Sequence, residues 1–544
     1  MIQDIWLLLK PYKKQLVVIL LLMLVTAGVS FVLPFFSKHL LDDGLIGRDL
    51  QAVLIFAGLL FLFSVIQHLL QLLQTRQETL LSQNMGAEWK EKAFAHSLRL
   101  KAGYFQDRSF YKIIHDAMYD IDHIMSIADG IFLTSVVTVF EMIGVTAALF
   151  FLDWRLSLFL MALLPVRILL NLWSSKRVEK LADEMRDAHR GYNKWFENLL
   201  GGIREIKLWG LYDRKGKEYD GKIRSIQKAE KRILLHERRE GAASGTLHQL
   251  FVSAIYVTGG VILLKTDFTV GSLVTFVTYM GTLLGTVDML MSFRFFTHRI
   301  APNIEGLRSF FELEEEENKG TKTLEKIEEI RFNHVGVTLE EKEVLKDVSF
   351  AIRRGEHIWL RGENGSGKST LLNVLLRFIE PDEGTVSVNG IPVQEYDLAA
   401  YRKCFCTVPQ DVALFDGTIL ENISMGREIR KEDLEQYRFA SDFILEKEEG
   451  WQTKTGTEGT KLSGGEKQKI AFLRAVCVPS QVLILDEATS GYDKGSDEEM
   501  NRWLREENRF PISIAVSHRT TEFTEKDRVL ELENGTIRET GKRT

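Results

Sequence analysis

The sequence predicts an all-α, six-span transmembrane domain followed by an α/β P-loop nucleotide-binding domain. Long apolar runs fill roughly the first 300 residues, and a glycine-rich loop stands between an apolar strand and a helix in the second half. At 544 residues the chain also exceeds what a single core usually holds. We expect the transmembrane domain over residues 1–310, a linker over 311–326 and the nucleotide-binding domain over 327–544.

Six stretches are apolar enough to cross a bilayer, for which about 20 residues suffice. They lie at residues 16–36, 51–72, 130–151, 156–174, 247–265 and 271–292. The first stretch is longer than the apolar core of a signal peptide, and no small-residue cleavage site follows it. We therefore expect it to remain as a membrane span surrounded by lipid.

The charged intervals between the spans predict the orientation of the chain. Lys and Arg precede the first span and are frequent in the long second and fourth intervals, whereas the third and fifth intervals are short turns. Because cytoplasmic loops are enriched in these residues, we expect the N-terminus and the nucleotide-binding domain in the cytosol, below the cytoplasmic membrane. Apolar residues at helical spacing in the long intervals predict helices that continue beyond the membrane, although periodicity alone fits a solvated charged helix equally well.

Glu141 and Arg167 are the clearest ionisable residues inside the predicted spans. A charge at the centre of a span costs some 2.5–3.5 kcal/mol on insertion scales. Both residues stand thirteen positions from Trp154, at the turn between the third and fourth spans, so both lie about 20 Å from that turn. We expect either a Glu141–Arg167 pair that fixes this hairpin or a Glu141 that lines a cavity and receives a cationic group of a substrate.

Net charge and cysteine content argue against a nucleic-acid-binding protein and against a disulfide-stabilised protein. A net charge of −6 does not suggest a nucleic-acid partner, and the acidic run in the linker is most simply explained by solvation. The chain has 3 cysteines, Cys404, Cys406 and Cys477, all in its second half. A disulfide framework is therefore not expected.

The glycine-rich loop spans residues 362–370 and reads G-E-N-G-S-G-K-S-T. This P-loop pattern lets backbone N–H groups close around phosphates at a helix N-terminus, where Lys368 neutralises charge and the Ser369 hydroxyl can ligate magnesium. The candidate binding residues here are Gly362, Asn364, Gly365, Ser366, Gly367, Lys368, Ser369 and Thr370.

Two further motifs follow the P-loop. Ser463, Gly464 and Gly465 open a helix, and an apolar strand over 482–485 ends in Asp486 and Glu487. In this order and spacing the three motifs resemble those of ATP-binding cassette (ABC) transporters. Six spans ahead of one cassette resemble a half-size exporter of the type IV architecture, and the resemblance covers essentially the whole chain.

The resemblance implies a role for each motif residue. Asp486 matches the aspartate that holds Mg²⁺, Glu487 the residue that polarises the attacking water, and His518 the switch histidine. Gln410 matches the glutamine that ligates Mg²⁺ and senses the membrane half. Residues 463–465 match the signature that contacts the ATP held by the other subunit. ATP and Mg²⁺ are thus the expected ligands, and a dimer, preferably of identical chains, is the expected assembly.

Two positions depart from the family pattern. Leu339 stands where an aromatic residue usually stacks on adenine, so apolar contact is expected to replace stacking. The D-loop, commonly Ser-Ala-Leu-Asp, reads S-G-Y-D over residues 490–493, which puts communication between the two ATP sites in doubt.

The expected function is ATP-driven export of a small amphipathic substrate, such as a modified or cyclic peptide, by alternating access. A lipid flippase or a multidrug exporter is the alternative within the class. An ATP-binding regulator or channel without sustained turnover is the alternative from another class, and intact Lys368, Asp486, Glu487 and His518 argue against it.

Overall fold

The computed structural model describes residues 9–105, 110–125, 132–339, 341–488, 491–492, 494–506, 509–516 and 528–539. Its internal contacts divide the chain into two compact units. The helical unit comprises Met1–Leu98 and Phe110–Leu313, and the α/β unit comprises Arg99–Ser109 and Glu314–Thr544. The predicted combination of an all-α domain with an α/β domain is confirmed.

Two β-sheets form the framework of the α/β unit. The strands are β1 (Glu329–Leu339), β2 (Lys342–Arg353), β3 (His357–Arg361), β4 (Glu383–Val388), β5 (Ile391–Pro392), β6 (Phe405–Val408), β7 (Val482–Asp486), β8 (Ile512–Val516), β9 (Arg528–Glu533) and β10 (Thr536–Glu539). A four-stranded antiparallel sheet has the order β2-β1-β4-β5, and a six-stranded sheet has the order β10-β9-β3-β8-β7-β6. From β9 to β6 the strands of the larger sheet are parallel.

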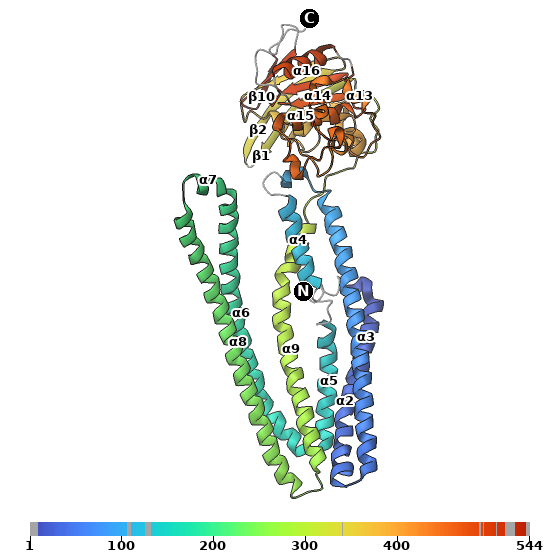
Figure 1. Cartoon of the computed structure of the whole chain (residues 1–544), viewed down its shortest axis with the longest axis vertical. Coiled ribbons are helices and arrows are strands. Elements are labelled where there is room, and N and C mark those ends of the chain that lie inside the picture. Colours follow the sequence, from blue (N-terminus) through green and yellow to red (C-terminus); the bar gives the residue numbers. More distant parts are fainter. Residues whose placement is uncertain are drawn as a thin grey trace. The chain divides into compact units, whose positions relative to one another are not determined.

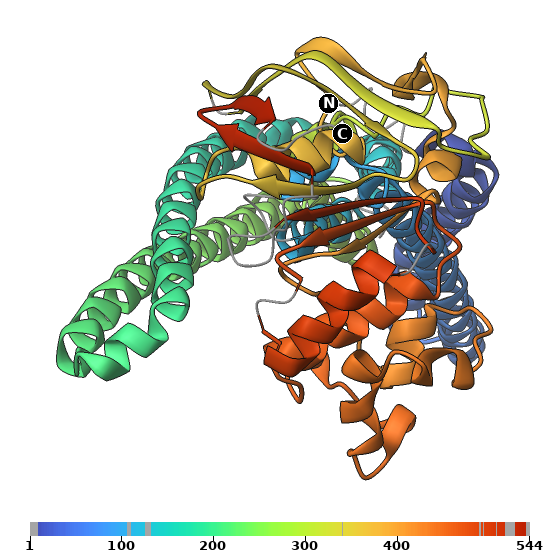
Figure 2. The ribbon, with the colours of Figure 1, turned by 90° about the horizontal axis from the view of Figure 1, so that it is seen from above.

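The larger sheet is covered on both faces, as near-continuous apolar strands require. Alternate residues of β3 enter different cores: Ile358 and Leu360 pack in one, with helix α10 (Lys368–Leu375), and Trp359 packs in the other, with helix α15 (Gly464–Val476). Seen from above, helix α16 (Lys494–Glu506) lies on one side of these strands and α10 on the other (Figure 2).

The acidic run of the linker does more than interact with solvent. Both Glu316 carboxylate oxygens accept hydrogen bonds from Arg402, at 2.7 and 2.9 Å, and Lys101 pairs with Glu314 at 2.5 Å. Arg402 and Glu316 are only a quarter or less exposed, so this two-pronged pair is better shielded than a surface ion pair. The explanation by solvation alone was therefore incomplete.

Eight α-helices are described in the helical unit (Figure 1). They are α2 (Lys13–His39), α3 (Leu50–Ser97), α4 (Phe110–Met125), α5 (Phe132–Leu152), α6 (Trp154–Gly201), α7 (Ile203–Leu208), α8 (Tyr212–Leu263) and α9 (Val270–Phe311). Asp153 caps α6 by accepting from the Arg155 amide at 2.8 Å, and Thr269 caps α9 by accepting from the Ser272 amide at 3.1 Å. The two short intervals predicted from the sequence are therefore helix starts.

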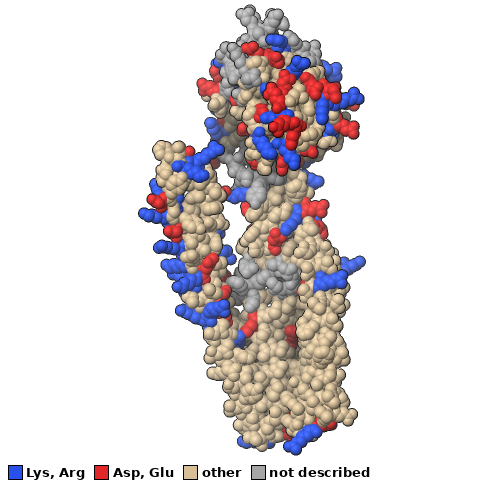
Figure 3. Space-filling view, in the orientation of Figure 1, with Lys and Arg blue, Asp and Glu red and all other residues tan. Residues whose placement is uncertain are grey.

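Six of the described helices are long and apolar enough to cross a membrane, which confirms the predicted number. Figure 3 shows few charged side chains over the lower part of this unit, apart from its lower end. Helices α3, α6 and α8 have 48, 48 and 52 residues, so at about 1.5 Å per residue they continue well beyond their apolar segments, as predicted.

A shared apolar core joins α5, α6, α8 and α9. Leu149, Leu160, Ile255 and Phe276, one residue from each helix, have no exposed surface. α6 and α8 run side by side along much of their length (Figure 1). The sixth span thus packs against both helices of this pair as well as against α5.

The expected Glu141–Arg167 pair is wrong. Arg167 is 7% exposed; its Nε donates to Asp288 Oδ1 at 3.0 Å, its Nη2 donates to Asp288 Oδ2, and its Nη1 donates to the Ser244 carbonyl at 3.0 Å. Asn171 Nδ2 adds a bond to Asp288 Oδ1 at 2.7 Å. Equal distance from the turn placed Glu141 and Arg167 at similar depth, but the packing of α6 against α8 and α9 decides which way Arg167 points.

We predict that Arg167→Gln lowers the thermal stability of the purified chain, because it removes the guanidinium that donates to both Asp288 carboxylate oxygens. Asp288 is about one-third exposed, so we expect a loss of about 1–3 kcal/mol, less than for a fully buried pair. Asp288→Asn in the Arg167→Gln background should restore part of that loss. Thermal unfolding in detergent measures both, with Glu141→Gln as the matched control. Rescue of Arg167→Gln by Glu141→Gln instead of Asp288→Asn would contradict this pairing.

Candidate functional site

The P-loop lies between β3 and α10, as the sequence predicted. Gly367 precedes α10 with a φ of 107°, a conformation that strongly favours glycine, and a Cβ there would lie 3.1 Å from the Val344 carbonyl oxygen. The Ser366 hydroxyl oxygen is buried and makes no hydrogen bond with any described residue. A buried hydroxyl and free amides at a helix N-terminus fit a phosphate group.

The Lys368 side chain forms hydrogen bonds with the backbone of its own loop. Its side chain is 8% exposed, and its ammonium donates to the carbonyl oxygens of Gly362 at 2.8 Å and Glu363 at 2.9 Å. Burial lowers the pKa of Lys368, and the carboxylates of Glu487 and Asp486 partly oppose that effect. An additional anion at the loop would therefore stabilise the protonated lysine.

The two carboxylates of the second motif stand at the carboxyl end of β7. Asp486 is the last residue of that strand, and Glu487 follows with a φ of 47°, which a non-glycine residue rarely adopts. Gln410, just beyond β6, donates from Nε2 to Glu487 Oε2 at 2.7 Å. The structure thus brings Gln410, Glu487 and Lys368 together from three separate segments.

Sequence reasoning missed one residue of this arrangement, Gln468 on α15. Gln468 is 5% exposed; its Nε2 donates to the Glu487 carbonyl at 3.4 Å, and its Oε1 accepts from the Gly491 amide at 3.0 Å. A polar residue at a core position of an otherwise apolar helix face was the available signal. Gln468 ties the start of the D-loop to the backbone of Glu487.

The start of α15 is a well-capped helix N-terminus. The Ser463 hydroxyl accepts from the Glu466 amide at 3.3 Å, and the Glu466 carboxylate accepts from the Ser463 amide at 2.7 Å. Lys447 pairs with Glu466 at 2.6 Å. Burial favours a raised pKa for Glu466, but the hydrogen bonds from Lys447 and Ser463 outweigh it, so the pKa is lowered and the carboxyl stays ionised.

Two glycines at this point approach each other closely. A Cβ on Gly465 would lie 2.2 Å from the Gly491 carbonyl oxygen, and a Cβ on Gly491 would lie 2.9 Å from the Gly465 nitrogen. Steric contact therefore explains why glycine stands at position 491, where the sequence departs from the family's D-loop pattern. A Cβ on Gly464, in contrast, would meet no atom within 4 Å, so this end of the helix is open.

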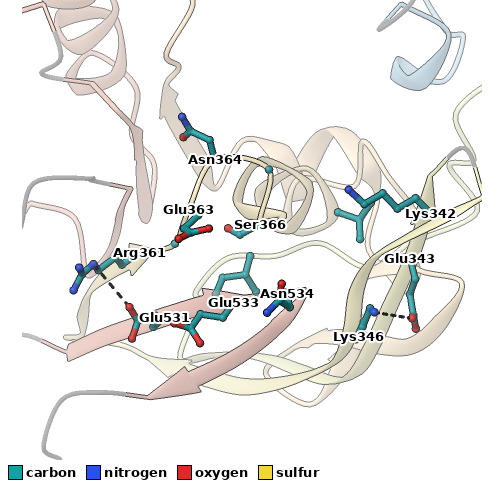
Figure 4. A pocket seen from close by; sticks show the side chains of 15 residues that line it. Lys342, Glu343, Lys346, Arg361, Glu363, Asn364, Ser366, Glu531, Glu533 and Asn534 are labelled. Carbon is teal, nitrogen blue, oxygen red and sulfur yellow. Dashed lines mark ion pairs between the residues drawn. The ribbon is translucent and has the colours of Figure 1, made fainter.

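A polar cavity of about 670 Å³ adjoins the first half of the P-loop (Figure 4). Its described walls are the start of β2, the P-loop residues 362–366 and the β9–β10 hairpin. Arg361 pairs with Glu531 at 3.9 Å and Lys346 with Glu343 at 3.4 Å along these walls (Figure 4). Its size lies within the range of small-molecule sites.

The remaining predicted site residues either do not line this cavity or lie outside the described residues. Leu339, at the end of β1, is half-buried against the core beneath the sheet and is not among the described residues that line the cavity. Ser369 and Thr370 belong to the first turn of α10, where Ser369 is exposed. His518, Ser490 and Asp493 lie outside the described residues. In the helical unit, Arg167 bonds to Asp288 and not to Glu141.

Comparisons with known proteins agree with this arrangement. Residues 16–287 match the family model of the ABC transporter transmembrane region, and residues 345–490 match the ABC transporter model. A solved structure of a bacterial Atm1-family ABC exporter with ATP bound aligns with a TM-score of 0.82 at 22% identity, covering 97% of this chain and 95% of that one. At this identity the structural likeness shows the fold.

Curated relatives align over nearly the whole chain. The ATP-dependent lipid A-core flippase of Vibrio vulnificus (strain CMCP6) is 26% identical over 548 residues, which cover 99% of this chain and 94% of that protein. The ATP-dependent lipid A-core flippase of Burkholderia thailandensis is 28% identical over 549 residues, covering 98% and 91%. With both family models matched in one chain, the protein belongs to the ABC transporter family, has the half-size exporter architecture and couples ATP hydrolysis to transport.

Proposed function

We propose that this chain exports a small amphipathic molecule across the cytoplasmic membrane by alternating access, with its α/β unit in the cytosol. The observation that carries the proposal is the convergence of Lys368, Gln410 and Glu487 at one end of a parallel sheet. A regulator or channel that only binds ATP would not need a carboxylate held at this position. The six apolar helices of the helical unit, which are long enough to cross a membrane, support the export proposal.

The proposed roles follow from the geometry. Amides of the P-loop and the Lys368 ammonium bind the phosphates, and binding exchanges the lysine's bonds to Gly362 and Glu363 for bonds to phosphate oxygens. Glu487 then accepts a proton from the water that attacks the γ-phosphorus, while the bond to the β-phosphate oxygen breaks. His518 is proposed to hold the γ-phosphate from the far side.

The residues present also fit a magnesium ion. Asp486, Ser369 and Gln410 supply a carboxylate, a hydroxyl and an amide oxygen, which are the hard oxygen ligands that Mg²⁺ prefers. When bound, the ion would neutralise phosphate charge and orient the terminal phosphate. Gln410 can keep its Nε2 hydrogen bond to Glu487 while Oε1 faces the ion, because the amide carries its donor and its acceptor on separate atoms.

We propose a dimer of identical chains as the working assembly. One chain carries one P-loop and one Ser463–Gly465 signature, and the start of α15 is open at Gly464. A second copy could present that N-terminus to the ATP bound at Lys368, giving two equivalent sites. ATP would bind the closed dimer more tightly than the open one, and this difference would drive the spans to open outward.

The relatives bear on the choice of substrate. The relatives named above are lipid A-core flippases, which favours a membrane-dissolved amphiphile and supports the lipid flippase alternative. A modified or cyclic peptide and a drug-like molecule share this amphipathic character and remain alternatives.

We predict that Glu487→Gln leaves ATP binding intact and lowers steady-state ATPase activity by orders of magnitude, because an amide cannot accept the proton of the attacking water. Nucleotide affinity and phosphate release by the purified chain measure the two effects. Glu363→Gln, an exposed residue of the same loop whose side chain has no role in the proposed step, is the control. Near-normal ATPase activity of Glu487→Gln would rule out the assignment and leave a channel or regulator as the better explanation.

We also predict that Leu339→Tyr tightens ATP binding, because an aromatic ring at the end of β1 would add stacking on adenine. Base–aromatic stacking sets an upper range of about 1–3 kcal/mol. Thr338→Tyr, one residue earlier and on the opposite face of the strand, should leave the affinity unchanged. Titration with a fluorescent ATP analogue gives both affinities, and equal effects of the two substitutions would show that another residue contacts the base.

A further inference from the structure

The helical unit contains a cavity of about 380 Å³ between α6, α8 and α9. Its described walls mix polar, acidic and apolar side chains. They are Asn171, Ser174, Ser175, Val178, Glu237, Glu240, Ser244, Asp288 and Met291. Ligand sites of small molecules begin at about 300 Å³, so the head group of an amphiphile fits here.

The arginine beside this cavity has no charge to offer a ligand. Arg167 uses Nε and Nη2 on the Asp288 carboxylate and Nη1 on the Ser244 carbonyl, and Asn171 bonds to the same carboxylate. Arg167 and Asp288 therefore cancel each other's charge. Ser174 is also occupied, because its hydroxyl lies 3.2 Å from His236 Nε2. This network fixes the wall formed by the three helices and leaves it neutral.

Two carboxylates then decide the charge of the cavity. Glu237 and Glu240 stand one helical turn apart on α8, on the face that also carries Ser244. Glu240 is half-buried, and neither carboxylate has an ion pair with any described residue. Arg238 and Arg239, between them in sequence, point to other faces of the helix, since each residue turns it by about 100°. The cavity thus has an excess of negative charge, and apolar contact comes from Val178 and Met291.

We propose that this cavity binds the cationic head, an ammonium or guanidinium group, of the amphipathic molecule that the chain exports. The inference rests on the proposed export function and specifies its substrate class. The two carboxylates, for which the described residues supply no ion pair, attract a cation and repel a phosphate or a sulfonate; this effect is stronger at the half-buried Glu240 than at the exposed Glu237. The tail of such a molecule would lie against the apolar surfaces of α6 and α9. Asp288, already neutralised, shapes the wall and contributes no net charge.

The test uses the full-length protein in lipid nanodiscs. Two fluorescent amphiphiles with the same tail, one with a trimethylammonium head and one with a sulfonate head, are titrated below their micellar concentrations. We expect the cationic probe to bind and to stimulate ATPase activity, and the anionic probe to do neither. Glu240→Gln and Glu237→Gln should each raise the half-maximal concentration of the cationic probe roughly tenfold, the value of one lost charge-assisted contact.

Two further variants separate a lost contact from a damaged fold. Glu240→Asp keeps the charge and should keep most of the probe affinity. Asp220→Asn removes an exposed carboxylate of the same helix about 30 Å away and should change nothing. Basal ATPase activity and melting temperature should stay near wild type in all of these variants, because none of the changed residues touches the nucleotide site.

The outcomes distinguish this inference from the function on which it rests. Equal binding of both probes, or an affinity unchanged in the Glu237→Gln/Glu240→Gln double variant, would overturn the cationic site while leaving ATP-driven export in place. The proposed function would be overturned if the wild-type protein hydrolysed ATP no faster than the Glu487→Gln variant. Probe binding would still report on the cavity in that case, since it requires no turnover.

Discussion

The parallel arrangement of the strands from β9 to β6 is the constraint on which the nucleotide site depends. Parallel strands direct their carboxyl ends to one edge of a sheet, and ligands of open α/β sheets bind beyond that edge. The P-loop follows β3, Gln410 follows β6 and Glu487 follows β7. Residues separated by more than 70 positions, such as Gln410 and Glu487, are therefore within hydrogen-bond distance. Apolar cores on both faces of the sheet keep this edge rigid.

At the nucleotide site, the described side chains with proposed catalytic roles form hydrogen bonds with other groups of the protein. Lys368 donates to two carbonyls of its loop, and the Glu487 carboxylate accepts from Gln410. Glu487 also has a left-handed backbone, which costs a non-glycine residue of order 1 kcal/mol or more and is common at functional sites. Gln468 contributes to holding this backbone through its bond to the Glu487 carbonyl. Phosphate oxygens would thus take over the hydrogen bonds that Lys368 now donates to two carbonyl oxygens.

In the helical unit one buried charge, that of Arg167, is paired before any ligand enters. Arg167 is bonded on all sides by Asp288 and Ser244, which removes the cost of an isolated cation among apolar helices. The same pairing leaves Glu237 and Glu240 to set the charge of the neighbouring cavity. One ion pair therefore stabilises the wall of the cavity, and other carboxylates select the charge of the ligand. Stability and specificity thus depend on different residues.

The sequence by itself determined the spans, the two domain types and the residues of the P-loop, signature and Asp486–Glu487 motifs, because each is a local pattern of apolar period or of fixed spacing. It also placed Glu141 and Arg167 at similar depth, since depth follows from 1.5 Å of rise per residue. Only the tertiary structure decided the partner of Arg167, the part played by Gln468 and the reason for glycine at 491. These depend on which face of one helix meets another and on how closely two backbones approach. Neither quantity is encoded in the spacing of residues along a single segment.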